Sequence, residues 1–109
     1  MAREQSVDEP TDLDSVLAAL DDADARDIIK AVDGPMTASE ISDTCGIPLS
    51  TTYRKLDHLT DAGLLLEGTE IRADGHHATT YEVAFEEVRI LLTEERRFAV
   101  EVARTERSP

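Results

Sequence analysis

Residues 37–66, TASEISDTCGIPLSTTYRKLDHLTDAGLLL, decide the fold, because they predict a helix, a tight turn and a second helix. Thr37 is followed three residues later by Glu40, which is the pattern of a capping box at a helix N-terminus. Ile41 is the inward-facing anchor of this first helix, and Gly46 ends it. The stretch is typical of a helix-turn-helix, an arrangement that places the polar face of the second helix in a DNA major groove.

The second helix of the motif is expected to begin near residues 48–50 and to run to Ala62, with Gly63 as a left-handed cap. A turn of roughly 100° per residue gathers one set of side chains on the core side: Leu49, Thr52, Tyr53, Leu56, Leu59 and Thr60. The opposite side carries Thr51, Arg54 and His58, flanked by Ser50 and Lys55.

The outward side of this helix has the chemistry of a DNA contact. Hydroxyl groups near a helix N-terminus donate to phosphates or base edges, and one Arg bonds both guanine acceptors at once. We therefore expect Arg54 to contact a base directly, with Thr51, Tyr53 and Lys55 on bases or phosphate. The alternative is an ordinary amphipathic helix with a solvated face.

After Gly63 the apolar period changes from that of a helix to that of a strand. Residues 64–73 and 79–85 are strand-like, with Ile71, Tyr81, Val83 and Phe85 alternating with polar residues. The Asp-Gly-His-His sequence at 74–77 favours a hairpin turn, so we predict a β-hairpin wing.

The tip of this wing carries Arg72, His76 and His77, which are candidates for contacts with DNA backbone or with the minor groove. A narrow minor groove concentrates negative potential and attracts arginine. A plain solvated turn and a histidine metal site are the alternatives. Adjacent histidines in a turn rarely coordinate one ion together, so no metal site is expected.

Two further helices are predicted before the motif, after a disordered acidic arm at residues 1–10. Thr11 is expected to cap the first of them, with an inner face of Leu13, Val16, Leu17 and Leu20. Asp21 and Asp22 then cap the second, which runs to about Asp33. Its inward residues are expected to be Ala25, Ile28, Ile29 and Val32, and residues 34–35, Gly-Pro, end it.

Residues 86–104 fit two interpretations. Strict alternation favours two strands on either side of residues 93–97, with the apolar positions Val88, Ile90, Leu92, Phe98, Val100 and Val102. A helix would instead align Val88, Leu91, Leu92, Phe98 and Val102, interrupted by Glu95. The Val, Ile and Phe content favours the hairpin. This extension is the candidate for dimer contacts, the alternative being that it closes the core of a monomer; residues 105–109 are a tail.

The net charge is -13, the opposite of what a DNA-binding protein usually shows. Residues 1–43 carry 12 acidic and 3 basic residues, whereas residues 44–81 carry only 5 and 3. The basic residues are nine Arg and two Lys. We interpret the chain as adapted to a salt-rich cytoplasm, where self-repulsion is screened, with most of its acid away from the predicted DNA face.

Several classes of protein are disfavoured. The chain of 109 residues has no phosphate-binding glycine loop, no metalloprotease motif and no nucleophile elbow, so we expect no enzyme activity and no cofactor. It has no apolar run of membrane-spanning length and a polar, acidic N-terminus, so a cytoplasmic location is expected. The single cysteine, Cys45, is expected to pack as a small apolar residue in the turn.

The run from ASEI at residues 38–41 through GIPLSTTYRKLDHLTDAGLL at 46–65 resembles winged helix-turn-helix regulators of the ArsR-like and TrmB-like kind. The resemblance covers residues 11–85, and the acidic, lysine-poor composition with the DGHH wing tip is similar to small haloarchaeal regulators. It implies a sequence-specific, homodimeric transcription factor with family DNA-contact positions at Ser50, Thr51, Tyr53, Arg54 and Lys55. The paired-cysteine site of metal-sensing members has no counterpart.

The expected fold class is thus α+β: a winged helix-turn-helix of four N-terminal helices and a hairpin wing, followed by an extra C-terminal hairpin or helix. The expected function is a homodimeric regulator of double-stranded DNA. The alternative is a winged helix that binds another protein of the transcription machinery through its acidic surface. A neutral or positive face around Arg54 favours the first, and a uniformly negative one favours the second.

Overall fold

The structure, a computed structural model, describes residues 12–104. The predicted acidic arm at residues 1–10, the predicted cap Thr11 and the tail at 105–109 lie outside this range. The chain forms four helices and five strands over the described residues, and all strand pairs are antiparallel. This is the α+β architecture of a winged helix-turn-helix with a second hairpin added.

The first two helices are α1 (Leu13–Leu20) and α2 (Ala23–Ala31). The N-cap of α1 is Asp12, whose carboxylate accepts from the backbone N–H of Asp14, so the expected cap at Thr11 was wrong by one residue. Asp22 is the N-cap of α2, as predicted. The second helix is shorter than expected: Val32 is already extended, and it lies two residues before Gly34.

The helix-turn-helix consists of α3 (Ala38–Cys45) and α4 (Leu49–Asp61). The capping box at α3 is confirmed: Thr37 Oγ1 accepts from the Glu40 N–H, and a Glu40 carboxylate oxygen accepts from the Thr37 N–H. Gly46 then takes a left-handed φ of 68°, which glycine adopts without strain, and ends the helix. The bounds of α4 agree closely with the sequence prediction.

The wing is the hairpin of β2 (Leu65–Ile71) and β3 (His77–Val83). On its other edge, β3 pairs with β1 (Met36–Thr37), a two-residue strand that the sequence did not indicate. The strand order of the sheet is β1-β3-β2. The register pairs Leu65 with Val83 at the base and Ile71 with His77 at the tip. The short strand β1 therefore joins the wing to the start of α3.

The C-terminal extension at residues 86–104 forms a second hairpin, in which β4 (Phe85–Leu92) pairs with β5 (Phe98–Arg104). The two-strand interpretation of this segment is therefore confirmed, and the helical interpretation is excluded. Phe85 was expected in the wing, but Ala84 breaks the strand and Phe85 begins β4 instead. A register shift between Phe85 and Glu87 marks a bulge at this point. We call β4–β5 the C-terminal hairpin.

The core lies where the helices meet the bases of the two hairpins. Its fully buried large side chains come from the helices and from the first residues of the wing: Val16, Ile28, Ile41, Leu56, Leu59, Leu64 and Leu65. Leu17, expected on the inner face of α1, is exposed instead. Cys45 is half-buried at the end of α3, and burial raises the pKa of its thiol.

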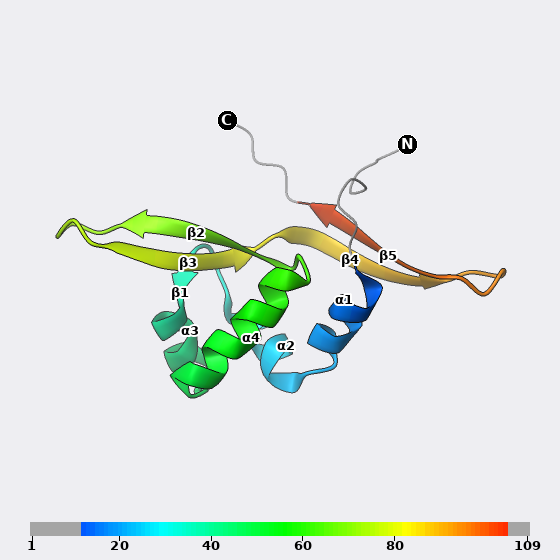
Figure 1. The fold of residues 1–109 in the computed structure, drawn as a ribbon, viewed down its shortest axis with the longest axis horizontal. Helices are drawn as coiled ribbons and strands as arrows, with labels where there is room; N and C mark the ends of the chain where they lie inside the picture. Colours follow the sequence, from blue (N-terminus) through cyan, green and yellow to red (C-terminus); the bar gives the residue numbers. More distant parts are fainter. Residues whose placement is uncertain (1–11, 105–109) are drawn as a thin grey trace.

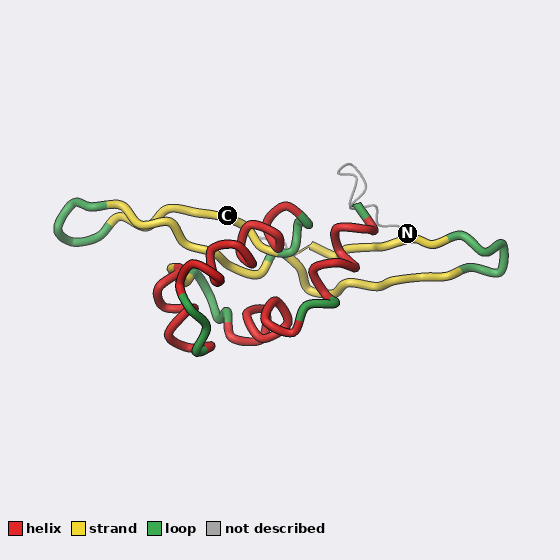
Figure 2. Tube along the Cα trace, turned by 60° about the horizontal axis from the view of Figure 1, so that its bottom comes forward, coloured by secondary structure: helices red, strands yellow, loops and turns green. Residues whose placement is uncertain are grey.

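The molecule is elongated, with extents of 55 × 34 × 17 Å. Figure 1 shows the four helices beneath the two hairpins, with the wing extending at one end and the C-terminal hairpin at the other. Figure 2, turned by 60°, shows the same two arms pointing in opposite directions from the helices. The two hairpins therefore present surfaces at opposite ends of the molecule.

Candidate nucleic-acid interface

The start of α4 is held in place by hydroxyl groups. The Ser42 hydroxyl donates to the Ile47 carbonyl at 2.6 Å, and the buried Thr52 hydroxyl donates to the Pro48 carbonyl at 3.0 Å. The first bond ties α3 to the turn, and the second lies within the first turn of α4. Because Thr52 is fully buried, it fixes which side of α4 faces the core.

The exposed stripe of α4 follows from that anchor, and we call it the recognition face: Ser50, Tyr53, Arg54, Asp57, His58 and Asp61. These positions recur at the three- and four-residue spacing of one helix side. Leu49 and Tyr53 were expected to face the core, but they are 42% and 49% exposed. The helix is therefore rotated relative to the prediction, and Tyr53 joins Arg54 on the outside.

The same rotation turns Thr51 and Lys55 away from the recognition face, and both are half-buried. Lys55 Nζ lies 2.8 Å from Asp22 Oδ2 at the start of α2, and the lysine side chain is only 18% exposed. This hydrogen bond lowers the pKa of the Asp22 carboxyl. The lysine thus joins α4 to the α1–α2 turn, and its charge is neutralised there.

The wing tip carries the other candidate residues, and all three are exposed: Arg72, His76 and His77. Arg72, which follows β2, pairs with Glu70 near the end of that strand at 3.6 Å. The Asp74 carboxylate accepts from His76 twice, from the ring Nδ1 and from the backbone N–H, each at 3.0 Å. The ring contact is the main reason that the pKa of Asp74 is lowered. The tip is an ordered turn that presents its imidazoles to solvent.

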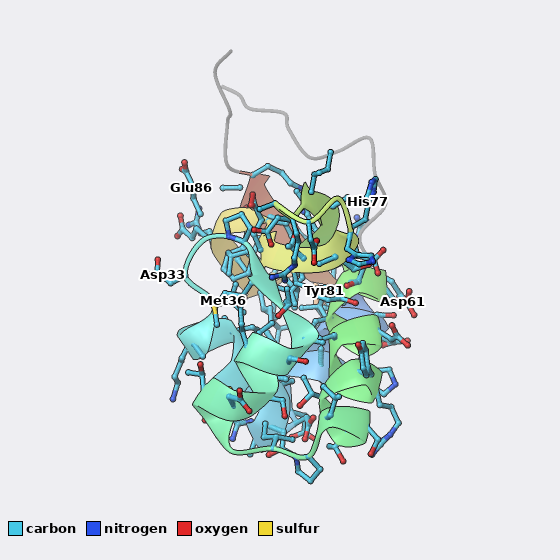
Figure 3. All side chains as sticks on the ribbon, turned by 90° about the vertical axis from the view of Figure 1, so that its left-hand side faces the viewer. Asp33, Met36, Asp61, His77, Tyr81 and Glu86 are labelled. Atoms are coloured by element: carbon cyan, nitrogen blue, oxygen red, sulfur yellow. The ribbon has the colours of Figure 1, made fainter. Side chains whose placement is uncertain are left out.

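Tyr81 is a residue whose role the sequence did not indicate. It is buried on β3, and burial is the main cause that raises its pKa, with Glu67, Asp57 and Tyr53 adding to the shift. Figure 3 shows Tyr81 between the sheet and the helices, with Asp61 and His77 on one side of the molecule. Tyr81 therefore lies where the wing base meets α4, close to the charges of both.

The charge on this side of the molecule is less favourable to a polyanion than the sequence suggested. Arg54 and Arg72 are accompanied on the recognition face and wing by five exposed carboxylates: Asp57, Asp61, Glu67, Glu70 and Asp74. Asp57 lies three residues after Arg54 on the same stripe. A helix with Thr52 buried and Tyr53 exposed places Asp57 on the outward side next to Arg54. The sequence would have shown this position of Asp57 if Tyr53 had not been assigned to the core side.

Neither a metal site nor a membrane span is found in the part of the chain that the structure describes. Residues 12–104 contain no group of three or more His, Cys, Asp or Glu side chains able to hold a metal ion. No helix in this range is long and apolar enough to cross a membrane.

Comparison with known proteins supports the fold. A family model described as a helix-turn-helix domain matches residues 20–68, which span α2, α3, α4 and the start of β2. A search of curated proteins gave no match. Among solved structures, the chain is similar to a possible transcriptional regulator from Methanosarcina mazei Go1, with a TM-score of 0.53 and 18% identity.

That similarity covers 68% of this chain and 66% of the other, slightly less than two thirds of the other chain's length. An identity this low establishes a shared fold. Together with the hairpin that follows α4, these matches support a winged helix-turn-helix fold, with the helix-turn-helix similarity at residues 20–68.

Proposed function

We propose that this protein is a sequence-specific, DNA-binding transcriptional regulator of the ArsR-like or TrmB-like kind, and that it acts as a homodimer. The observation that carries the proposal is the N-terminal half of α4, where Ser50, Tyr53 and Arg54 are exposed together on one stripe. Helix-turn-helix proteins contact base edges with this part of the second helix. The matched regulator of similar fold supports the same role.

The proposed contacts divide between bases and backbone. Arg54 is the candidate for bidentate contact with guanine, and Ser50 and Tyr53 are candidates for base edges or phosphate. His58 lies one turn further along α4, and the exposed wing tip supplies Arg72, His76 and His77 for the backbone or minor groove. Thr51 and Lys55 are the weakest members of the set, because both are half-buried and Lys55 is already paired.

The acid around Arg54 fits binding at high salt, and we propose that the protein works in a salt-rich cytoplasm. At molar salt the Debye length is about 3 Å, so carboxylates near the DNA repel phosphate weakly. Counterion release also gains little under these conditions. Specificity then depends on base edges and on DNA shape rather than on many phosphate contacts.

A homodimer would place its two α4 helices in successive major grooves. The expected operator is a pseudo-palindrome whose half-sites lie about 10 bp apart. The C-terminal hairpin, which extends away from the wing, supports this assembly because it leaves the recognition face open.

The test is selection of bound fragments from a genomic library by the purified protein, repeated from low salt to molar KCl. We expect a common motif with two half-sites, retained at molar KCl. Specific affinity that falls steeply as KCl rises would contradict the proposal, since it would indicate binding dominated by phosphate contacts.

A second candidate function is a winged helix that binds another protein of the transcription machinery. The five exposed carboxylates beside Arg54 and Arg72 favour it, because they suit a basic partner surface. The same selection separates the two functions. Failure to enrich any sequence at any salt concentration would favour the protein partner.

A further inference from the structure

The C-terminal hairpin has one apolar face that runs along its whole length. Three opposite pairs in the register make up this face: Val88 with Val102, Ile90 with Val100, and Leu92 with Phe98. The other face carries Glu87, Arg89 and Glu101 beside the single apolar pair Leu91 and Ala99, and Arg89 lies near both acids. The hairpin is therefore amphipathic, with one side suited to burial.

Within residues 12–104, only the inner half of the apolar face is covered. Val102 is buried, and Val88 and Val100 pack against the core beside α1, which contacts β5. The outer half is not covered: Ile90, Leu92 and Phe98 are 44%, 62% and 63% exposed. Figure 1 shows the hairpin extending beyond α1, so no other element of the described chain lies over its end.

An isolated two-stranded hairpin is only marginally stable in water, and adjoining large apolar side chains on a surface mark an interaction site. The wing also exposes Leu66 and Ile71, but their cross-strand partners are Glu82 and His77, so they form no such patch. Among the cross-strand pairs of residues 12–104, two large apolar side chains that are both exposed face each other only at Leu92 and Phe98, at the end of the C-terminal hairpin.

We infer that the outer apolar half of the C-terminal hairpin packs against the same surface of a second copy of this chain, across a two-fold axis near residues 93–97. This inference deepens the homodimer proposed above by naming its interface: Ile90, Leu92 and Phe98 of each copy. An isologous contact of this kind closes on itself and gives a dimer rather than a filament.

The charge distribution favours a second copy over another partner. Residues 85–104 carry five acidic residues and four arginines, in a chain whose net charge is -13. The hairpin therefore carries little of the chain's negative charge, so two copies repel each other only weakly there. The loop sequence Glu94-Glu95-Arg96-Arg97 is also self-complementary, because a two-fold axis can set the acids of one copy opposite the arginines of the other.

The same hairpin is tied to the end of α4. Arg104 Nη1, in β5, donates to the Gly63 carbonyl at 2.7 Å, just after the helix ends. A dimer joined through β4–β5 would therefore hold the two recognition helices at a fixed separation. The interface would set the spacing of the half-sites.

The test is sedimentation velocity of the full chain at low salt and at molar KCl, without DNA. We expect a dimer that tightens as KCl rises, since salt screens the repulsion between two acidic copies. The double substitution Leu92→Ser with Phe98→Ser should raise the dimer Kd by at least about 100-fold. A monomeric wild-type protein in molar KCl, or an unchanged Kd in the double variant, would overturn the inference.

The matched control is Leu66→Ser with Ile71→Ser, which removes equally exposed apolar side chains from the other hairpin. It should leave the Kd unchanged, and an equal loss there would show that the effect is not specific to the C-terminal hairpin. Circular dichroism checks that each variant is folded.

A second measurement locates the interface in folded protein. In a Cys45→Ser background, Leu92→Cys should form a disulfide-linked dimer on oxidation much faster than Ile71→Cys, because the two-fold axis brings both copies of position 92 together. Equal rates would contradict the proposed axis. Neither experiment uses DNA, so their failure is distinct from failure of the proposed DNA binding.

Discussion

Lys55 Nζ in α4 lies 2.8 Å from Asp22 Oδ2 at the start of α2. This ion pair joins α4 to the turn between α1 and α2. It also occupies one of the two lysines of the chain, so that Lys55 is not available to contact phosphate. With Lys55 neutralised and Arg72 beside Glu70, Arg54 has no ion-pair partner within residues 12–104. In the proposed DNA complex, Arg54 is therefore the main candidate for base recognition.

The Asp22–Lys55 pair predicts a pH-dependent effect on stability. The folded state lowers the pKa of Asp22, so the pair stabilises the protein above the ordinary carboxyl pKa, and the contribution is lost as pH falls through the lowered value. Asp22→Asn should lower the free energy of unfolding by about 0.5–1 kcal/mol at pH near 7. The difference from wild type should vanish in acid, as measured by urea unfolding.

Asp21→Asn is the matched control, since it removes the same charge from the same turn and Asp21 has no ion pair in the described structure. Equal effects of the two substitutions, or an Asp22→Asn effect that persists in acid, would show that the ion pair does not stabilise the fold.

Arg54→Ala is predicted to lower affinity for the selected operator by about 1–3 kcal/mol and to relax specificity at one base pair per half-site. Arg54→Lys should keep the charge yet also lose specificity, because a single ammonium cannot form the bidentate contact. Competition with operators substituted at each position measures both effects. A uniform loss on all sequences would instead indicate a phosphate contact.

Asp57→Asn is predicted to raise affinity for non-operator DNA, because its carboxylate lies three residues from Arg54 on the recognition face. The gain should be about 0.5–1 kcal/mol at low salt and should become negligible at molar KCl. Titration of a random duplex at both salt concentrations measures it. Asp33→Asn is the control, since Asp33 lies on the opposite side of the molecule from Asp61 and His77 (Figure 3). An equal gain in affinity for the Asp33→Asn variant would show that the effect comes from the net charge of the protein and not from the position of Asp57.

The sequence was sufficient for the order and bounds of the main elements, because caps and turns carry local signals. The capping box of Thr37 with Glu40 and the left-handed Gly46 depend on contacts within a few residues. The strands at 85–104 were legible because their apolar residues alternate and their hairpin pairs neighbouring segments of the chain. The strand β1 was missed because two residues show no period, and it forms only by pairing with β3.

The exact orientation of α4 was harder to predict, because Leu49, Thr52 and Tyr53 are all acceptable at the edge of a core. The structure buries the small Thr52, whose hydroxyl is satisfied by the turn carbonyls, and leaves the larger Leu49 and Tyr53 exposed. That choice depends on tertiary packing, which the sequence pattern does not encode. It turned Lys55 away from the recognition face and placed Asp57 on it.

Gly63 and Arg104 should show coupled effects on stability. Gly63 has a left-handed φ of 78°, and an added Cβ would lie 3.3 Å from Arg104 Nη2. Gly63→Ala should therefore destabilise the protein by about 1 kcal/mol from backbone strain, and further by displacing the arginine. In an Arg104→Ala background there is no arginine to displace, so Gly63→Ala should lower the free energy of unfolding by less. A double-mutant cycle by urea unfolding should therefore be non-additive. Strict additivity would contradict the contact between them.

Tyr81 should titrate above the ordinary tyrosine pKa of about 10, chiefly because it is buried and partly because Glu67 and Asp57 are close. The chain has two tyrosines and no tryptophan, so Tyr53→Phe leaves Tyr81 as the sole source of phenolate absorbance. The raised pKa means that Tyr81 stabilises the fold below about pH 10 and that this contribution is lost as pH rises through the raised value. Adding Asp57→Asn should move the titration of Tyr81 back toward its ordinary range. Titration at the ordinary value in both variants would show that Tyr81 is not enclosed between the wing and α4.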